Sequence, residues 1–172
     1  MVTVTAEMFL PSSPEETWVA LGRRSTYFSF PGVTPGAKAA GPLQHALDLP
    51  IVERVEQTAA LSVGRAGRNG RRERRFALRG PLVSIAGHWQ LEPSEGGVRL
   101  HVTLGYEIAP PLKAQAVNTL RSRSPLPIRT DADAILSRAV DEFFETRFTE
   151  QAAACCERLR ARVEQPKRGQ PA

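Results

Sequence analysis

Two long stretches of alternating apolar and polar residues, joined by a short turn, constrain the fold of this chain most strongly. Between residues 83 and 108, apolar side chains recur at every second position on both sides of a turn with the sequence Glu-Pro-Ser-Glu-Gly-Gly. A period of two puts successive side chains on opposite faces of a strand, so each stretch buries one face. The pair therefore predicts an antiparallel hairpin in a sheet that is covered on one side. The core-facing residues are Val83, Ile85, Trp89, Leu91, Val98, Leu100, Val102, Leu104, Tyr106 and Ile108.

Two earlier segments show the same alternation. Residues 2 to 10 carry apolar side chains at even positions, and residues 43 to 57 carry them mainly at odd positions. Pro50 interrupts the second segment, where we expect a bulge, a sheet edge or the corner between two strands.

A further hairpin is expected between the segment 43 to 57 and the strand that begins at Val83. Leu61 and Val63 begin another strand, and Asn69-Gly70 is favoured in two-residue hairpin turns. The turn predicts a return strand that contains Phe76 and Leu78 and ends before Gly80-Pro81.

Helical patterns lie near both ends of the chain. Ser13, Pro14 and Glu16 form a capping box that predicts a short helix ending at Gly22. After an irregular segment from 109 to 130, in which residues 112 to 120 are compatible with a short helix, apolar residues recur at helical spacing over about 30 residues. The members of this stripe are Leu136, Val140, Phe144, Phe148, Ala152, Cys155, Leu159 and Val163.

The length of 172 residues is typical of one domain. We expect a single domain over residues 1–165 and a disordered tail over 166–172. Cys155 and Cys156 are neighbours, which excludes a disulfide framework and fits a reducing compartment. No apolar run approaches the roughly 20 residues that span a bilayer, and residues 1 to 10 lack a signal-peptide core. A cytoplasmic protein is therefore expected.

Segments at both ends of the predicted sheet resemble one superfamily. The stretch Phe9–Trp18 (FLPSSPEETW) resembles a first strand that runs into "apolar-x-P-x-E-x-x-W". The stretch Gly87–Pro93 (GHWQLEP), followed by GGVRL, resembles a hairpin of the form "G-x-W-x-L-E-P … G-G-T-x-L". With the last helix, the likeness covers residues 2 to 163. The chain thus resembles the START and Bet v 1-like (SRPBCC) superfamily, and Gly80-Pro81 ahead of His88-Trp89 is similar to its bacterial aromatic polyketide cyclases and aromatases.

The resemblance implies an α+β helix-grip fold, in which a curved antiparallel sheet wraps around the C-terminal helix and leaves an internal cavity. Such a cavity suits an apolar small molecule and implies no cofactor. The sequence departs from the pattern in its long Arg-rich hairpin, in the long segment 109 to 130, and in having no clear match to the inward arginine of aromatase members.

The resemblance leads to one main hypothesis of function and two alternatives. The main hypothesis is a cyclase or dehydratase that acts on a polyketide-like intermediate by acid–base catalysis. The first alternative is a non-enzymatic carrier or sensor of a lipid or polycyclic ligand, and the second is a protein-interaction module that uses the Arg-rich hairpin.

Candidate catalytic residues lie on the core-facing positions of the strands. His45 and Glu53 are flanked by apolar residues on the odd face of 43 to 57, and Tyr106 lies on the buried face of its own strand. Burial raises the pKa of a carboxyl group and lowers that of an imidazole, toward values useful for proton transfer. We expect His45 as the base, Glu53 as its orienting group or the acid, and Tyr106 as a donor to an enolate oxygen. The alternative is that the sheet curls at Pro50, so that His45 or Glu53 reaches solvent at the rim.

Aromatic residues are the candidates for ligand contact, although each also suits a plain core position. They are Trp89, Tyr27, Phe28, Phe30 and Phe144. His88 and His101 lie on the polar face without a third ligand, so no metal site is expected.

Basic residues concentrate in one segment. The formal net charge is +5, and residues 65 to 79 hold Arg65, Arg68, Arg71, Arg72, Arg74, Arg75 and Arg79 beside one acid, Glu73. Three interpretations of this segment, Arg65–Arg79, are open. It is a solvated hairpin, a surface for an acidic partner such as a polyketide synthase carrier protein, or a nucleic-acid site. Phe76 is its only aromatic residue, which argues against base stacking and so against nucleic acid. The sequence predicts no oligomeric state.

Overall fold

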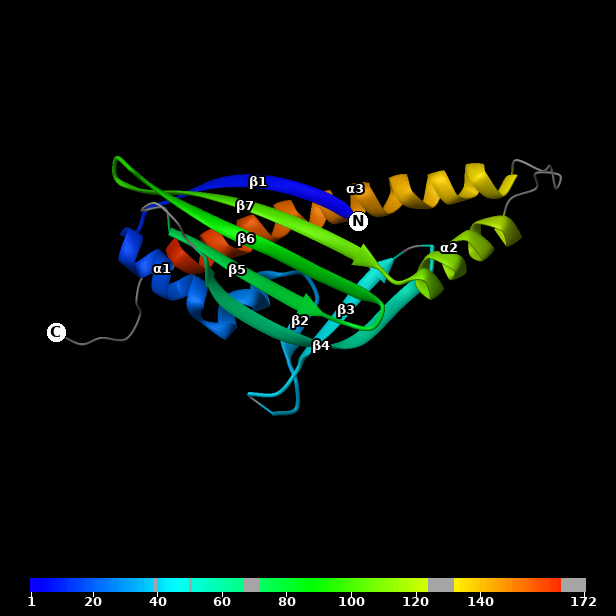
Figure 1. Ribbon diagram of the computed structural model, residues 1–172, viewed down its shortest axis with the longest axis horizontal. Coiled ribbons are helices and arrows are strands. Elements are labelled where there is room, and N and C mark those ends of the chain that lie inside the picture. The colour runs from blue at the N-terminus through cyan, green and yellow to red at the C-terminus, as the bar shows by residue number, and fades with distance from the viewer. Residues whose placement is uncertain (39, 50, 67–71, 124–131, 165–172) are drawn as a thin grey trace.

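Seven antiparallel strands form one sheet that bends around a long helix (Figure 1). The computed structural model describes residues 1–38, 40–49, 51–66, 72–123 and 132–164. The strand order is β1-β7-β6-β5-β4-β3-β2. The strands are β1 (Val2–Leu10), β2 (Val33–Pro35), β3 (Leu43–Leu49), β4 (Glu53–Ala66), β5 (Arg72–Arg79), β6 (Val83–Ser94) and β7 (Gly97–Ile108).

The hairpin of β6 and β7 forms the centre of the sheet, as the alternation predicts. Its register pairs Ile85 with Tyr106 and Ser94 with Gly97. The turn is completed by Gly96, whose φ of 75° is a backbone conformation that glycine adopts without a Cβ penalty. Every apolar residue predicted for the core face is buried except Ile108, which is half-buried at the strand end.

The segment 43 to 57 contributes to two strands, β3 and β4, and Pro50 between them lies outside the described residues. The amide of Val52 donates to the carbonyl of Leu49 over 2.9 Å, and the register pairs Leu49 with Glu53. Because these paired residues are both odd-numbered, the odd positions face the core on both strands. The first half of β4 pairs with β3 and its second half with β5. β4 therefore connects the part of the sheet that contains β3 to the part that contains β5.

The edge strand β2 is not predicted by the sequence. It is short and lies in the Gly- and Pro-rich segment, where it pairs with the start of β3. The predicted Asn69-Gly70 turn between β4 and β5 lies outside the described residues.

The helix α1 (Pro14–Gly22) begins with the predicted capping box. The Ser13 hydroxyl accepts from the amide of Glu16, whose carboxylate accepts from the amide of Ser13. A short 3-10 helix, η1 (Arg24–Ser29), follows and directs Tyr27 into the core, where its hydroxyl donates to the carbonyl of Leu21 over 3.0 Å.

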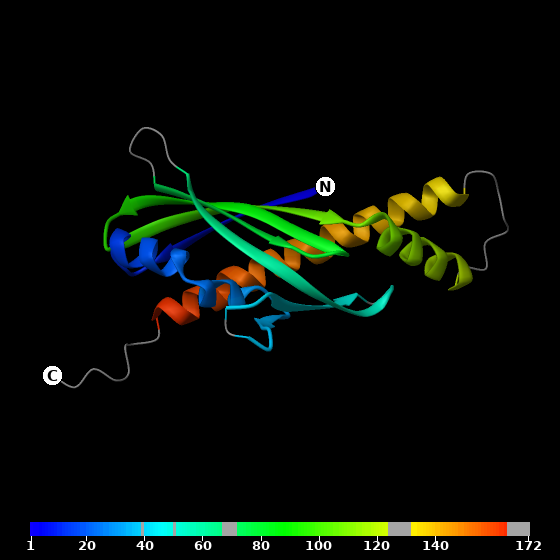
Figure 2. The same ribbon diagram turned by 60° about the horizontal axis from the view of Figure 1, so that its bottom comes forward.

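The helices α2 (Pro110–Arg123) and α3 (Ala132–Glu164) complete the fold. α2 is longer than the predicted helix at 112 to 120. Together α2 and the start of α3 project beyond the sheet (Figure 2), joined by ion pairs of Lys113 with Asp141 and Arg121 with Asp133. No helix in the described parts of the chain is long and apolar enough to cross a membrane.

The predicted apolar stripe of α3 packs on the concave face of the sheet. The buried members are Val140, Phe144, Phe148, Ala152, Cys155 and Leu159. Leu136 is half-exposed because it lies on the part of α3 that projects beyond the sheet. The side chain of Val163 lies outside the described residues.

Candidate functional site

Aromatic side chains fill the space between the concave face of the sheet and α3. Tyr27, Phe30 and Trp89 are buried, and Phe76 joins them with ring centroids 5.0, 5.5 and 5.6 Å away, respectively. A second group consists of Tyr106, Phe144 and Phe148. Of the predicted ligand contacts, only Phe28 is half-exposed.

The expected internal cavity is nearly filled by these rings. A space of about 160 Å³ remains in the first group, in gaps too narrow for a water molecule. It is lined by Tyr27, Phe30, Phe76, Leu78 and Ile85. Ligand pockets usually measure roughly 300–1,000 Å³. The space beside these rings therefore offers no preformed pocket for a ligand.

The hydroxyl of Tyr106 is a buried polar group in this apolar interior. Tyr106 is 1% exposed and stacks on Phe148 with a centroid distance of 4.1 Å, yet its hydroxyl has no hydrogen-bond partner among the described residues. Burial raises the pKa of Tyr106 far above its usual range, and the nearby Cys155 thiol adds to the effect. The hydroxyl thus stays protonated, as both a donor and an acceptor.

Trp89 contributes a second polar atom to the same wall. Its indole nitrogen lies near the Tyr27 hydroxyl, but the pair does not have hydrogen-bond geometry. Burial raises the pKa of Tyr27 to about 12.

His45 is held in a buried polar cluster with Gln57. The side-chain oxygen of Gln57 accepts from the amides of Leu82 and Val83, both over 3.0 Å. Its side-chain nitrogen therefore faces the Val83 carbonyl, 2.7 Å away, and His45 Nδ1, 3.2 Å away. Because this nitrogen donates, Nδ1 accepts and the ring proton sits on Nε2.

The second ring nitrogen of His45 is also engaged. The backbone of Pro31 hydrogen-bonds the ring, and since its carbonyl can only accept, Nε2–H is the donor. Burial lowers the pKa of His45 to about 4. We name His45, Gln57 and the Leu82-Val83 backbone the Gln57 clamp, because Gln57 joins β3, β4 and the start of β6. Gln57 occupies an odd, core-facing position of the segment 43 to 57, and no motif in the sequence indicates its role.

The three predicted catalytic residues lie on three different strands. The backbone of Glu53 begins β4 and pairs with Leu49 rather than with His45, and its side chain lies outside the described part. His45 is on β3 and Tyr106 on β7, with three strands between them. The acid–base roles of these residues remain predictions.

The arginine segment is partly structural. Arg74 points inward from β5, is 8% exposed, and its guanidinium lies 4.1 Å above the ring of Trp18 and donates to the Trp18 carbonyl. Arg72 forms an ion pair with Glu15 of α1. Two of the seven arginines therefore hold α1 against the sheet, and the alternation Arg74-x-Phe76-x-Leu78 is the signal that places Arg74 inside. An acidic partner stays a prediction for the exposed Arg75 and Arg79.

The remaining polar and sulfur candidates are the histidines of β6 and β7 and the cysteines of α3. His88 pairs with Thr103 and His101 with Gln90, so the two histidines are not directly opposite. Among the described residues, no group of three metal-ligating side chains occurs. Both cysteines are buried, and burial raises the pKa of Cys156 to about 11 and that of Cys155 further.

Comparison with known proteins bears on the fold. No family model matches the chain, and no curated protein matches its sequence. The structure is similar to a START superfamily protein from Mycobacterium smegmatis, with a TM-score of 0.54 at 13% identity over 95% of this chain and 97% of that chain. It is also similar to the KanY protein, with a TM-score of 0.53 at 13% identity and the same two coverages. The chain therefore has the α+β helix-grip fold of START superfamily structures, which confirms the resemblance predicted from the sequence at the level of fold.

Proposed function

We propose that this protein binds a small, mostly apolar molecule between the concave face of the sheet and α3. The unpartnered hydroxyl of Tyr106 carries the proposal. A buried polar group without a hydrogen bond costs about 1–3 kcal/mol, so native proteins rarely keep one without a reason. A ligand with one acceptor or donor group would pair with the hydroxyl and relieve that cost.

The filled interior limits how such a ligand binds. The gap next to Tyr27 and Phe76 is too narrow for a water molecule. A ligand therefore has to displace aromatic side chains or shift α3. Because Trp89 lies in the same wall, binding should change the tryptophan fluorescence of the protein.

Replacing Tyr106 by Phe should separate ligand binding from stability. Removal of an unpartnered hydroxyl should raise the free energy of unfolding by about 1 kcal/mol. The matched control, Tyr27→Phe, removes a hydroxyl that donates to Leu21, so it should lower that free energy by about 1 kcal/mol. Urea denaturation of both variants measures the two signs.

The same variants test recognition with two probes, 1-naphthol and naphthalene. The wild-type protein should bind 1-naphthol about five- to tenfold more tightly than naphthalene, because only the former pairs with the Tyr106 hydroxyl. Tyr106→Phe should abolish this preference, and Tyr27→Phe should keep it. Failure of the wild type to bind either probe in a fluorescence titration would refute the proposal.

The finer hypothesis is a cyclase or dehydratase acting on a polyketide-like substrate. What supports it is that a neutral imidazole and a protonated phenol both face the interior. A role for His45 as the base is disfavoured because both of its ring nitrogens already take part in hydrogen bonds. If His45 is the base, His45→Ala should reduce turnover of a poly-β-ketone substrate far more than it reduces binding, whereas equal losses would indicate a structural role.

A further inference from the structure

The strand β1 presents a free edge of the sheet. Among the strands that the structure describes, its only partner is β7, and it forms the upper rim of the sheet in Figure 1. Within the described residues, the one backbone hydrogen bond that β1 makes outside the sheet links the Leu10 carbonyl to the Ser12 amide. One row of backbone groups along Val2–Phe9 is therefore left for another strand.

The opposite edge of the sheet is protected, and this one is not. β2 is three residues long and ends at Pro35, and short strands and proline are common means of blocking edge pairing. β1 is nine residues long and contains no proline and no lysine. Its one charged residue, Glu7, is already matched by Arg99 at 3.1 Å and His101 at 3.3 Å on β7.

We propose that two copies of this chain pair through β1, antiparallel, about a two-fold axis at Thr5. In this register Thr5 lies opposite the partner's Thr5, Thr3 opposite the partner's Glu7, and Met1 opposite the partner's Phe9. Isologous pairing of this kind is the commonest way for a protein to form a closed dimer. The two seven-stranded sheets become one continuous sheet.

The exposed side chains of β1 select this register. Met1 and Phe9 are 94% and 43% exposed, and directly opposite side chains cover each other in an antiparallel pair. An axis at Glu7 would instead place two carboxylates opposite each other, which is destabilising. An axis at Ala6 would pair Phe9 with Thr3 and leave Met1 beyond the partner strand.

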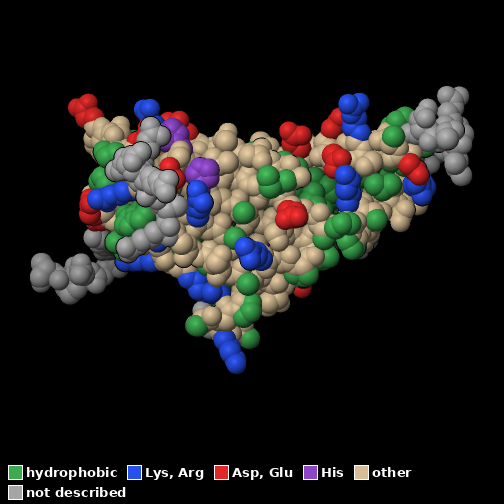
Figure 3. All heavy atoms as spheres, viewed as in Figure 1, with side chains coloured by type: hydrophobic (Ala, Val, Ile, Leu, Met, Phe, Trp, Pro, Cys, Tyr) green, Lys and Arg blue, Asp and Glu red, His purple; other side chains and the backbone are tan. Residues whose placement is uncertain are grey.

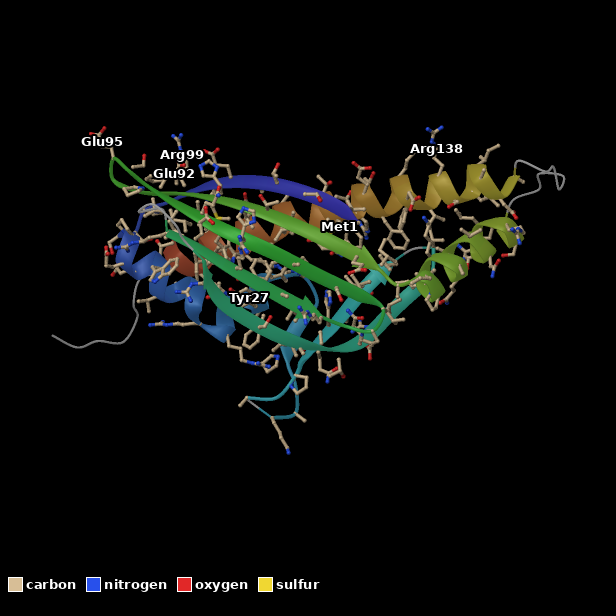
Figure 4. The ribbon with its side chains drawn as sticks, in the orientation of Figure 1. Met1, Tyr27, Glu92, Glu95, Arg99 and Arg138 are labelled. Atoms are coloured by element: carbon tan, nitrogen blue, oxygen red, sulfur yellow. The ribbon has the colours of Figure 1, made fainter. Side chains whose placement is uncertain are left out.

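The surface of this rim is compatible with the close approach of a second copy of the chain. Figure 3 shows few charged side chains along the rim between the histidine-containing cluster at one end and α3 at the other. Figure 4 shows Met1 at one end of this rim, with Glu92 and Arg99 at the other. The middle of β1, where the axis lies, carries threonines on its outer face.

Sedimentation velocity over micromolar to hundreds of micromolar protein tests the dimer. The wild type should dimerise, and Thr5→Lys should weaken the dimer about tenfold or more by placing two ammonium groups opposite each other at the axis. The matched control, Thr58→Lys, adds the same charge to an exposed position of β4 and should leave the dimer unchanged. A monomer at all concentrations overturns the proposal, and so does a dimer that persists in Thr5→Lys.

Cysteine cross-linking tests the register. Paired Cα atoms on adjacent antiparallel strands are about 4.5–5.5 Å apart, within disulfide range, so Thr5→Cys should give a covalent dimer on mild oxidation. Thr3→Cys should not, because the two copies of residue 3 are four residues apart along the strands, roughly 13 Å. The native cysteines are buried and give little background. Cross-linking of Thr3→Cys but not of Thr5→Cys would overturn this register.

Discussion

Replacing Gln57 by Leu should lower the free energy of unfolding by about 4 kcal/mol. Leucine keeps most of the volume but leaves the amides of Leu82 and Val83 and the carbonyl of Val83 without the partner they have in the Gln57 clamp. Each buried backbone group without a hydrogen bond costs about 1–3 kcal/mol. Urea denaturation followed by far-ultraviolet circular dichroism measures the loss.

The control for this variant is Gln44→Leu on the neighbouring strand. Gln44 is exposed and accepts only a long hydrogen bond of 3.5 Å from Thr58. The same substitution there should change the free energy of unfolding by less than about 0.5 kcal/mol. Equal effects of the two substitutions would show that the Gln57 clamp does not hold the sheet together.

Acid should destabilise this protein through His45. The unfolded chain takes up a proton at this imidazole near the usual pKa of 6.5, whereas the folded chain does so only near a pKa of about 4. Between these values the unfolded state binds the extra proton, so the contribution is fully present above pH 6.5 and is lost as the pH falls to 4. The difference in pKa corresponds to about 3 kcal/mol.

The variant His45→Asn isolates this contribution. Asparagine offers an oxygen that accepts from Gln57 but has no group that titrates in this range. The free energy of unfolding of the wild type, minus that of the variant, should fall by about 3 kcal/mol between pH 6.5 and 4. A difference that stays constant across this range would contradict the burial of a neutral imidazole, and carboxylates elsewhere cancel in the subtraction.

Periodicity predicts most of the fold because each strand buries one face. The even positions of β1 and the odd positions of β6 face the core as expected, and the capping box starts α1 where Ser13 and Pro14 indicate. The alternation cannot tell one continuous strand from two strands joined by a tight turn, since residues 49 and 53 share a face in both arrangements. Only the pairing partners of β4 decide this point.

The interior polar groups are harder to predict because their partners are distant in sequence. Gln57 is recognisable as a polar residue on a core face, but its partners at Leu82 and Val83 belong to a turn that the chain reaches much later. In the sequence, Arg74 belongs to a basic cluster, and its packing on the ring of Trp18 is seen only once the structure places α1 against β5. Alternation likewise indicates that Phe76 and Trp89 face inward, but it does not show that their rings pack together with those of Tyr27 and Phe30 and fill the space.

The pairing of β1 with β7 has a consequence for how the chain is made. β1 is synthesised before the rest of the sheet, and its partner β7 begins only at Gly97, while synthesis adds about 5–20 residues per second. β1 of each nascent chain therefore waits on the order of ten seconds for the strand that completes its hydrogen bonds. During translation from one messenger RNA, several such unpaired strands are held close together, and chaperones that bind extended apolar segments should meet this protein at residues 2 to 10.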